Sequence, residues 1–254
     1  MARKQWAARV HAARSVRSFF HPTRRDKFLT REQRLHVLFH NARAMNTPVD
    51  SKSAQGHELM LATNALGPFL LTELLKPLMV DTAKCSPTGS VRIVWVSSII
   101  ALGTPQGGIV WDSRYEGLAL LQSPSSNDMQ SKAGLVFLAH ECAREMGRQG
   151  IISVSLHPGL LKTELQRHMP ALARVIMGAV FKGPKAGAVT EVFAGFSPEV
   201  TQEQNGRYII PWGRFGVLPD HVAVGLRSEE EGGNGLAICF TRWCDSVTQP
   251  FRTL

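Results

Sequence analysis

The chain has 254 residues, of which 44% are hydrophobic, and this composition suits one large α/β domain better than two small ones. Its net charge of +9 is concentrated at the amino end, because residues 1–34 contain ten Lys/Arg and two Asp/Glu while the rest is almost balanced. The sequence contains no apolar run of about eighteen residues and no zinc-type cysteine spacing, so we expect neither a membrane span nor a zinc framework.

Residues 1–27 are predicted to be a basic leader in front of a domain at residues 28–254. Residues 1–25 contain no acidic residue, which is typical of a mitochondrial presequence or of a membrane-surface helix. The apolar stripe through Trp6, Val10 and Ala13 is poor, and no aromatic interleaving or recognition motif supports a nucleic-acid partner. We therefore favour a solvated leader over the presequence, a cytoplasmic protein with reduced cysteines, and no nucleic-acid partner.

Apolar patterning gives the order of the predicted elements. Continuous apolar runs predict strands at residues 35–40, 91–97, 151–156 and 207–211. Helical spacing predicts helices at residues 55–79, 128–146 and 185–196, and a Gly/Pro/Ser-rich loop covers residues 101–126. Strands that alternate with helices indicate a Rossmann-type, doubly wound parallel sheet with helices on both faces. Pro211 favours an edge position for the last strand, because proline cannot donate to a central ladder.

Polar and turn residues follow the predicted strands where a ligand is expected. Asn41 follows the first strand, Ser97 and Ser98 end the second, and Pro158-Gly159 follows the third. Open α/β sheets bind ligands beyond the carboxyl ends of their strands. The sequence therefore predicts a ligand site at this edge of the sheet.

Five short motifs stand in order along these elements. They are His40-Asn41-Ala42-Arg43, Thr63-Asn64, Ser97-Ser98, Gln130-Ser131-Lys132 and Pro158-Gly159-Leu160-Leu161-Lys162-Thr163. In this order they resemble the short-chain dehydrogenase/reductase family, above all its fungal, retinol-dehydrogenase-like subgroup, from about Phe28 to the carboxyl terminus. The resemblance implies an NAD(P)-dependent oxidoreductase that acts on an alcohol or carbonyl of a small molecule, in fungal specialised metabolism.

The resemblance also implies roles for single residues. Ser98 would hydrogen-bond the substrate carbonyl, Lys132 would hold the nicotinamide ribose and activate the proton donor, and Asn64 would anchor a relay water. The residues implied to contact the cofactor, NADP or NAD, are Asn41, Leu161 and Thr163, together with Lys132. The helices at residues 56–79 and 128–146 resemble those that pair between family subunits, which implies a homodimer. No metal site is expected, and His36 and His40 are interpreted as structural.

The family's catalytic tyrosine is replaced by Asp128. An aspartate carboxyl has a reference pKa of about 3.9, so it has no proton to give at neutral pH. We expect Asp128 to form an i,i+4 ion pair with Lys132. Neither Tyr115 nor Tyr208 has the family's spacing to the lysine, although Tyr115 could swing in from its loop. The alternative to an active enzyme is an inactive family member, kept as an interaction module or as a decayed product.

The family's glycine-rich nucleotide loop is not found before Leu35. We therefore expect an amino-terminally truncated domain that lacks its first strands, with the strand at residues 35–40 left at an unpaired apolar edge. The motif Gly232-Gly233-Asn234-Gly235 is no substitute, because it does not follow a strand. Arg43 stands where the family has a glycine, and it would either clash with the cofactor or meet a phosphate.

Overall fold

The computed structural model describes the chain except for residues 1–21, 46, 49, 115–116, 162–180 and 253–254. The predictions for most of the leader, for Tyr115 and for Thr163 therefore lie outside the described residues. Helix α1 (Pro22–Leu29) runs across the predicted boundary between residues 27 and 28, and the division into leader and domain stays a prediction. None of the described helices is long and apolar enough to cross a membrane.

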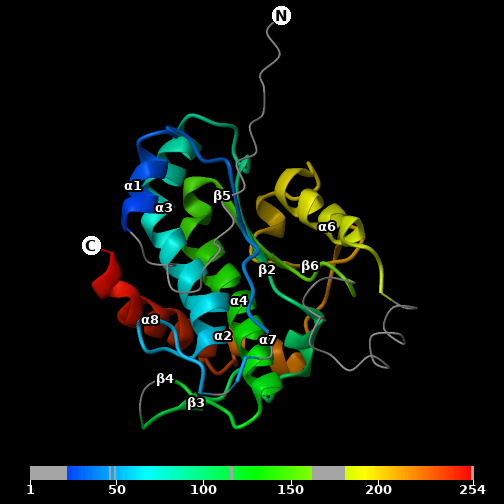
Figure 1. Ribbon diagram of the computed structural model, residues 1–254. Helices are drawn as coiled ribbons and strands as arrows, with labels where there is room; N and C mark the ends of the chain where they lie inside the picture. Colours follow the sequence, from blue (N-terminus) through cyan, green and yellow to red (C-terminus); the bar gives the residue numbers. More distant parts are fainter. Residues whose placement is uncertain (1–21, 46, 49, 115–116, 162–180, 253–254) are drawn as a thin grey trace, which may run out of the picture.

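A five-stranded sheet forms the centre of the fold (Figure 1). Its order is β1 (Val37–His40), β2 (Val91–Val96), β5 (Ile151–Leu156), β6 (Tyr208–Ile210) and β7 (Arg214–Phe215). The first four strands are parallel, and β7 is antiparallel to β6. Every residue of β2 and β5 is buried, as a sheet covered on both faces requires. The predicted doubly wound α/β fold is confirmed.

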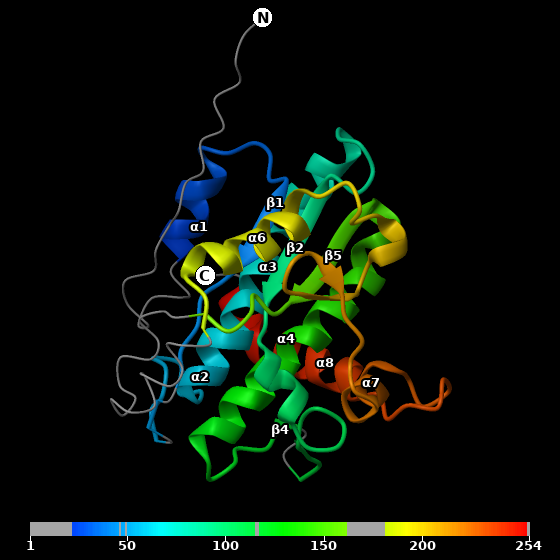
Figure 2. The same cartoon turned by 90° about the vertical axis from the view of Figure 1, so that its right-hand side faces the viewer.

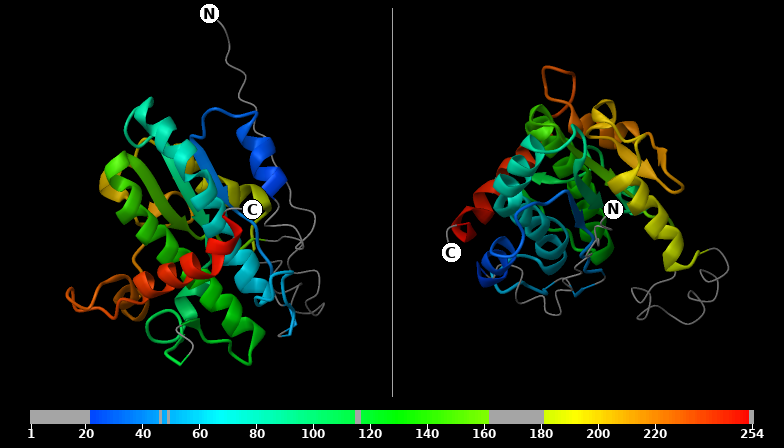
Figure 3. Two further views of the ribbon diagram at one scale, coloured as in Figure 1. Left: turned by 90° about the vertical axis from the view of Figure 1, so that its left-hand side faces the viewer. Right: turned by 90° about the horizontal axis from the view of Figure 1, so that it is seen from above.

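Helices cover both faces of this sheet (Figures 2 and 3). Side chains alternate between the two faces, so Ile93 and Trp95 belong to one apolar cluster while Val94 and Val96 belong to the other. The first cluster packs under α3 (Gly67–Lys84) and α4 (Pro124–Met146), and the second packs under α6 (Pro184–Phe196). The sheet is therefore the middle layer of three.

Two carboxyl-terminal helices were not predicted. Helix α7 (Asp220–Leu226) is followed by α8 (Leu236–Thr248), which lies on the outer side of α4. The approach is close, because a Cβ added to Gly134 would lie 2.7 Å from the Phe240 ring. Because the side chain of Gly134 is only a hydrogen atom, α8 can pack directly on α4.

The sheet edges differ in part from the predictions. Among the described residues β1 pairs only with β2, so it lies at an edge as predicted. The prediction that the last strand lies at an edge was wrong, because β6 lies between β5 and β7. Pro211 directly follows β6 in the turn to β7, where no ladder hydrogen bond is needed from its nitrogen.

Two predicted element boundaries also differ. The predicted loop at residues 101–126 contains the short antiparallel pair β3 (Trp111–Asp112) and β4 (Gly117–Leu118). It ends early, because α4 begins at Pro124 with Ser123 as its cap. The predicted helix at residues 55–79 begins only at α2 (Leu59–Leu61), passes through the π-helix η2 (Ala62–Leu66), and continues to the end of α3.

Candidate functional site

Ser98 and Lys132 are fixed at the same strand end. Ser98 follows β2, is half-buried, and accepts a hydrogen bond from the Ile100 nitrogen at 3.4 Å. The Lys132 Nζ donates to the Val96 carbonyl at 3.0 Å, and the Ser97 hydroxyl donates to the Lys132 carbonyl at 2.7 Å. Helix α4 is therefore bound to the carboxyl end of β2 through both the backbone and the side chain of Lys132.

Asn64 joins the segment after β1 to α4. Its Oδ1 accepts from the Ala44 nitrogen at 2.8 Å, and its Nδ2 donates to the Ala44 carbonyl at 3.1 Å and to the Ser131 hydroxyl at 2.9 Å. The side chain is fully buried within the π-helix η2, and such bulges are frequent at functional sites. A 3.6-residue period does not reveal this π-turn or the contacts of Asn64 within it.

Asp128 pairs with Arg43, not with Lys132. The Arg43 Nη2 donates to the Asp128 Oδ2 at 2.7 Å, and the Asp128 side chain is only 5% exposed. The Asp128 Oδ1 also accepts from Asn64 Nδ2 at 3.5 Å. The predicted i,i+4 ion pair was wrong, because the ammonium of Lys132 is turned towards β2 while the guanidinium reaches Asp128 from the segment after β1.

Lys132 is a buried cation. It is 1% exposed, and burial is the first cause that lowers its pKa from 10.5 to about 7. The positive charge of Arg43 lowers this pKa further, and the negative charge of Asp128 opposes the shift. Both members of the ion pair are therefore electrostatic neighbours of Lys132.

The remaining predicted site residues lie at the ends of β1 and β5. Asn41 is exposed directly after β1. Leu161 is half-buried after β5 and forms an isolated bridge with Lys182. Thr163 lies outside the described residues. The structure thus connects Asn64 to Asp128 by contact, whereas Asn41 directly follows β1 and Leu161 lies in the segment after β5.

Tyr208 is a neighbour of this site that the sequence did not indicate. Its hydroxyl donates to the Ser98 carbonyl at 3.3 Å from β6, and the residue is 2% exposed. Burial raises the pKa of Tyr208 above its usual value. A buried tyrosine of this kind positions the backbone of Ser98 and is not poised to release its proton.

His40 has the structural role that was predicted for it. Its Nε2 lies 2.7 Å from the Thr72 hydroxyl, and its ring lies 4.4 Å from the centre of Trp95. Burial lowers the pKa of His40 from 6.5 to about 3. The side chain is therefore neutral in the folded protein.

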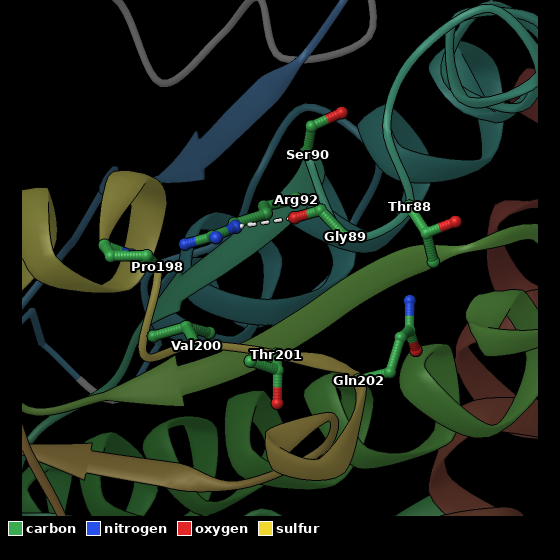
Figure 4. Close-up of a pocket in the computed structure, with 8 residues that line it drawn as sticks. All are labelled: Thr88, Gly89, Ser90, Arg92, Pro198, Val200, Thr201 and Gln202. Atoms are coloured by element: carbon green, nitrogen blue, oxygen red, sulfur yellow. Dashed lines mark hydrogen bonds between the residues drawn. The ribbon is translucent and has the colours of Figure 1, made fainter.

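A separate hollow of about 410 Å³ lies at the opposite end of the sheet (Figure 4). It is lined by Thr88, Gly89, Ser90, Arg92, Pro198, Val200, Thr201 and Gln202, none of which was predicted as a site residue. The Arg92 guanidinium donates to the carbonyls of Gly89, Ala194 and Ser197 at 2.9, 3.1 and 2.8 Å. These bonds connect β2 with the end of α6, so Arg92 braces the fold here.

The comparisons with known proteins identify the family. A protein of Phomopsis amygdali named as a short-chain dehydrogenase/reductase is 41% identical over 231 residues, which are 89% of this chain and 69% of that protein. This chain belongs to the short-chain dehydrogenase/reductase family. A second family member, from Neocamarosporium betae, is 35% identical over 89% of this chain and 66% of its own length. No family model matches the chain.

Solved structures of two carbonyl reductases share the fold. The carbonyl reductase Sniffer of D. melanogaster has a TM-score of 0.52 at 24% identity, over 77% of this chain and 73% of its own. The NADPH-bound carbonyl reductase from chicken fatty liver has a TM-score of 0.52 at 18% identity, over 77% and 69%. This chain spans about two thirds of the length of the curated relatives it matches.

Proposed function

We propose that this chain is an NAD(P)-dependent oxidoreductase that acts on an alcohol or carbonyl group of a small molecule, in fungal specialised metabolism. The observation that carries the proposal is the attachment of Lys132 to the end of β2, two residues before Ser98. A hydroxyl and a lysine side chain thus lie at one strand end, which supports the roles that the resemblance implies for them. Relatives named as short-chain dehydrogenase/reductases and the fold of NADPH-bound carbonyl reductase support it.

The donor chemistry at this strand end fits the nicotinamide end of a dinucleotide. An ammonium, a hydroxyl and a carboxamide come from Lys132, Ser98 and Asn64, and these groups suit a ribose and a carbonyl oxygen. When bound, the nicotinamide supplies or accepts the hydride. Contacts from Asn41, Leu161 and Thr163 complete the cofactor-binding part of the proposal. The described residues before β1 include no glycine-rich turn for the pyrophosphate, and NADP and NAD both remain open.

The chain's own residues would then act on the substrate oxygen. Ser98 donates a hydrogen bond to the carbonyl oxygen and stabilises negative charge as it develops there. Asn64 holds the segment after β1 against α4, so that the strand ends keep their spacing. Asp128 is bound to Arg43 and serves as an acceptor, not as a proton donor.

The proposal is tested by cofactor-dependent turnover of a panel of aldehydes and ketones with NADPH and with NADH. Ser98→Ala is expected to lower turnover by about 100-fold, the usual effect of removing one oxyanion donor. Ser125→Ala is the matched control, because Ser125 is exposed in the first turn of α4. Absence of nucleotide binding by calorimetry at millimolar concentration, or equal turnover in Ser98→Ala, would contradict the proposal.

A second candidate function is that of a catalytically inactive family member, retained as an interaction module or as a decayed product. The observation that favours it is the Arg43–Asp128 ion pair, because the resemblance implies a tyrosine at position 128 and the carboxylate that stands there is bound to a guanidinium. Stoichiometric nucleotide binding without any turnover would support this candidate. Turnover that Ser98→Ala abolishes would exclude it.

Assembly and location are further parts of the proposal. A homodimer through the helices at residues 56–79 and 128–146 would use α3 and α4, yet α8 packs against both of them within the chain. The homodimer stays a proposal, and light scattering tests it: the mass of two chains would support it and the mass of one would contradict it. A cytoplasmic location is proposed over a mitochondrial one, and the distribution of the tagged protein after cell fractionation tests it.

A further inference from the structure

The two residues that depart from the family pattern contact each other. Arg43 stands at the family's glycine and Asp128 at its tyrosine, 85 positions apart in the sequence. Their side chains form an ion pair at 2.7 Å and are 20% and 5% exposed. A glycine has no side chain to offer a carboxylate, and a tyrosine offers no anion to a guanidinium. Each replacement therefore supplies the partner that the other one needs.

Asn64 bonds to both segments that carry the ion pair, the segment after β1 and helix α4. The side chain of Asn64 makes two hydrogen bonds with the backbone of Ala44, the residue after Arg43. It also donates to Ser131 and, at a longer distance, to Asp128 in α4. Arg43 therefore extends towards Asp128 from a fixed backbone position, and the pair is part of the site's framework.

Lys132 is the third charged residue of the same cluster. The charged groups that act on it are Arg43, from the segment after β1, and Asp128, from α4 itself, while β2 contributes the Val96 carbonyl. Arg43 pairs with Asp128, and within the part of the chain that the structure describes no carboxylate forms an ion pair with Lys132. Burial without such a partner disfavours the ammonium form. The pKa of Lys132 is accordingly lowered to about 7, with burial as the largest cause.

We propose that Arg43 and Asp128 are one reciprocal replacement of the glycine and the tyrosine that the resemblance implies, and that this pairing keeps the Asp128 carboxylate from Lys132, whose ammonium is bound to the Val96 carbonyl instead. Arg43 and Asp128 are then positioning residues that act on the charge of Lys132. The pairing does not depend on the proposed function, because it needs neither cofactor nor substrate.

The test follows the titration of Lys132 itself, by NMR of the full chain with labelled lysine side chains and without nucleotide or substrate. Lys132→Arg assigns the signal by removing it, and exposed Lys84 is the internal control. A midpoint near pH 7 is expected in the unaltered chain. Arg43→Met is expected to raise the midpoint by about one pH unit or more, because it removes a cation and frees Asp128, while Asp128→Asn should lower it.

The opposite directions of these two shifts distinguish the inference from general destabilisation of the fold. Arg43→Lys keeps a cation and is expected to leave the midpoint within about half a pH unit of the original. A midpoint near 10.5 in the unaltered chain, or shifts of the same sign in the two variants, would overturn the inference. Absence of turnover would instead overturn the proposed function, since the titration needs neither cofactor nor substrate.

Discussion

Two arginines, one at each end of the sheet, show how differently a fold can hold the same side chain. Arg92, near the amino ends of the strands, donates to three backbone carbonyls, and burial alone lowers its pKa. Arg43, at the carboxyl ends, pairs with a carboxylate and acts on the charge of Lys132, and its buried Nε has no hydrogen-bond partner among the described residues. Both side chains are mostly buried, but only one of them belongs to a group of charges.

This difference separates a structural cation from one that can influence chemistry. The carbonyl partners of Arg92 do not titrate, so the charge at that end is constant across the pH range in which the protein is folded. The partner and the neighbour of Arg43 are a carboxylate and an ammonium, which are ionisable groups. Perturbed ionisable groups gather at functional sites more often than elsewhere. The comparison thus favours the carboxyl end as the reactive one.

The largest expected effect is on stability at the amino end. Arg92→Met removes three hydrogen bonds and leaves the buried Ala194 carbonyl and the half-buried Ser197 carbonyl without this donor, which should cost about 3–5 kcal/mol. Urea denaturation measures this loss, with Arg148→Met in an exposed position as the control. A loss of unfolding free energy below about 1 kcal/mol would show that Arg92 does not stabilise the fold, and the contrast between the two ends would then fail.

A smaller effect per pH unit is expected from His40, which the carboxyl end keeps neutral. Its pKa is lowered from 6.5 to about 3, so between these pH values the unfolded chain binds a proton that the folded chain does not. Stability should therefore fall as the pH is lowered from 6.5 towards 3, by about 1.4 kcal/mol per pH unit from this residue. Denaturation of His40→Gln across this range should show a slope that is shallower by that amount. Equal slopes in the two proteins would contradict the assignment.

The smallest effect is expected from Tyr208, which contacts the site only through a backbone carbonyl. Tyr208→Phe removes the hydrogen bond to Ser98 and should cost about 1 kcal/mol. Turnover, where it is measured, should change by less than about tenfold, because the hydroxyl positions Ser98 and transfers no proton. A loss of turnover as large as that of Ser98→Ala would make Tyr208 a catalytic residue.

The parts of the fold that could be predicted are those with a local signal. Strands β2 and β5 were predicted to within one residue, because a strand buried on both faces needs a continuous apolar run. The motif order likewise predicted that Ser98, Asn64 and Lys132 belong to one edge of the sheet. The π-turn at Asn64 and the packing of α8 on α4 lack such a signal, because both depend on contacts between distant segments.

The partners of the site residues could not be predicted from the sequence, for the same reason. Lys132 lies one helical turn from Asp128, and that spacing predicted an ion pair between them. The fold instead brings Arg43 to Asp128 across 85 positions and gives Lys132 a carbonyl on β2. The sequence showed both departures from the family pattern, but only the folded chain shows that they meet.

The measurement that tests this account most directly is a double-mutant cycle on Arg43 and Asp128. The free energy of unfolding is measured for the unaltered chain, Arg43→Met, Asp128→Asn and the double variant. Because each single change leaves the other charge of a mostly buried pair without its partner, the double variant should be more stable than the sum of the single losses by about 1–3 kcal/mol. Losses that add to within about 0.3 kcal/mol would show that the two replacements are independent.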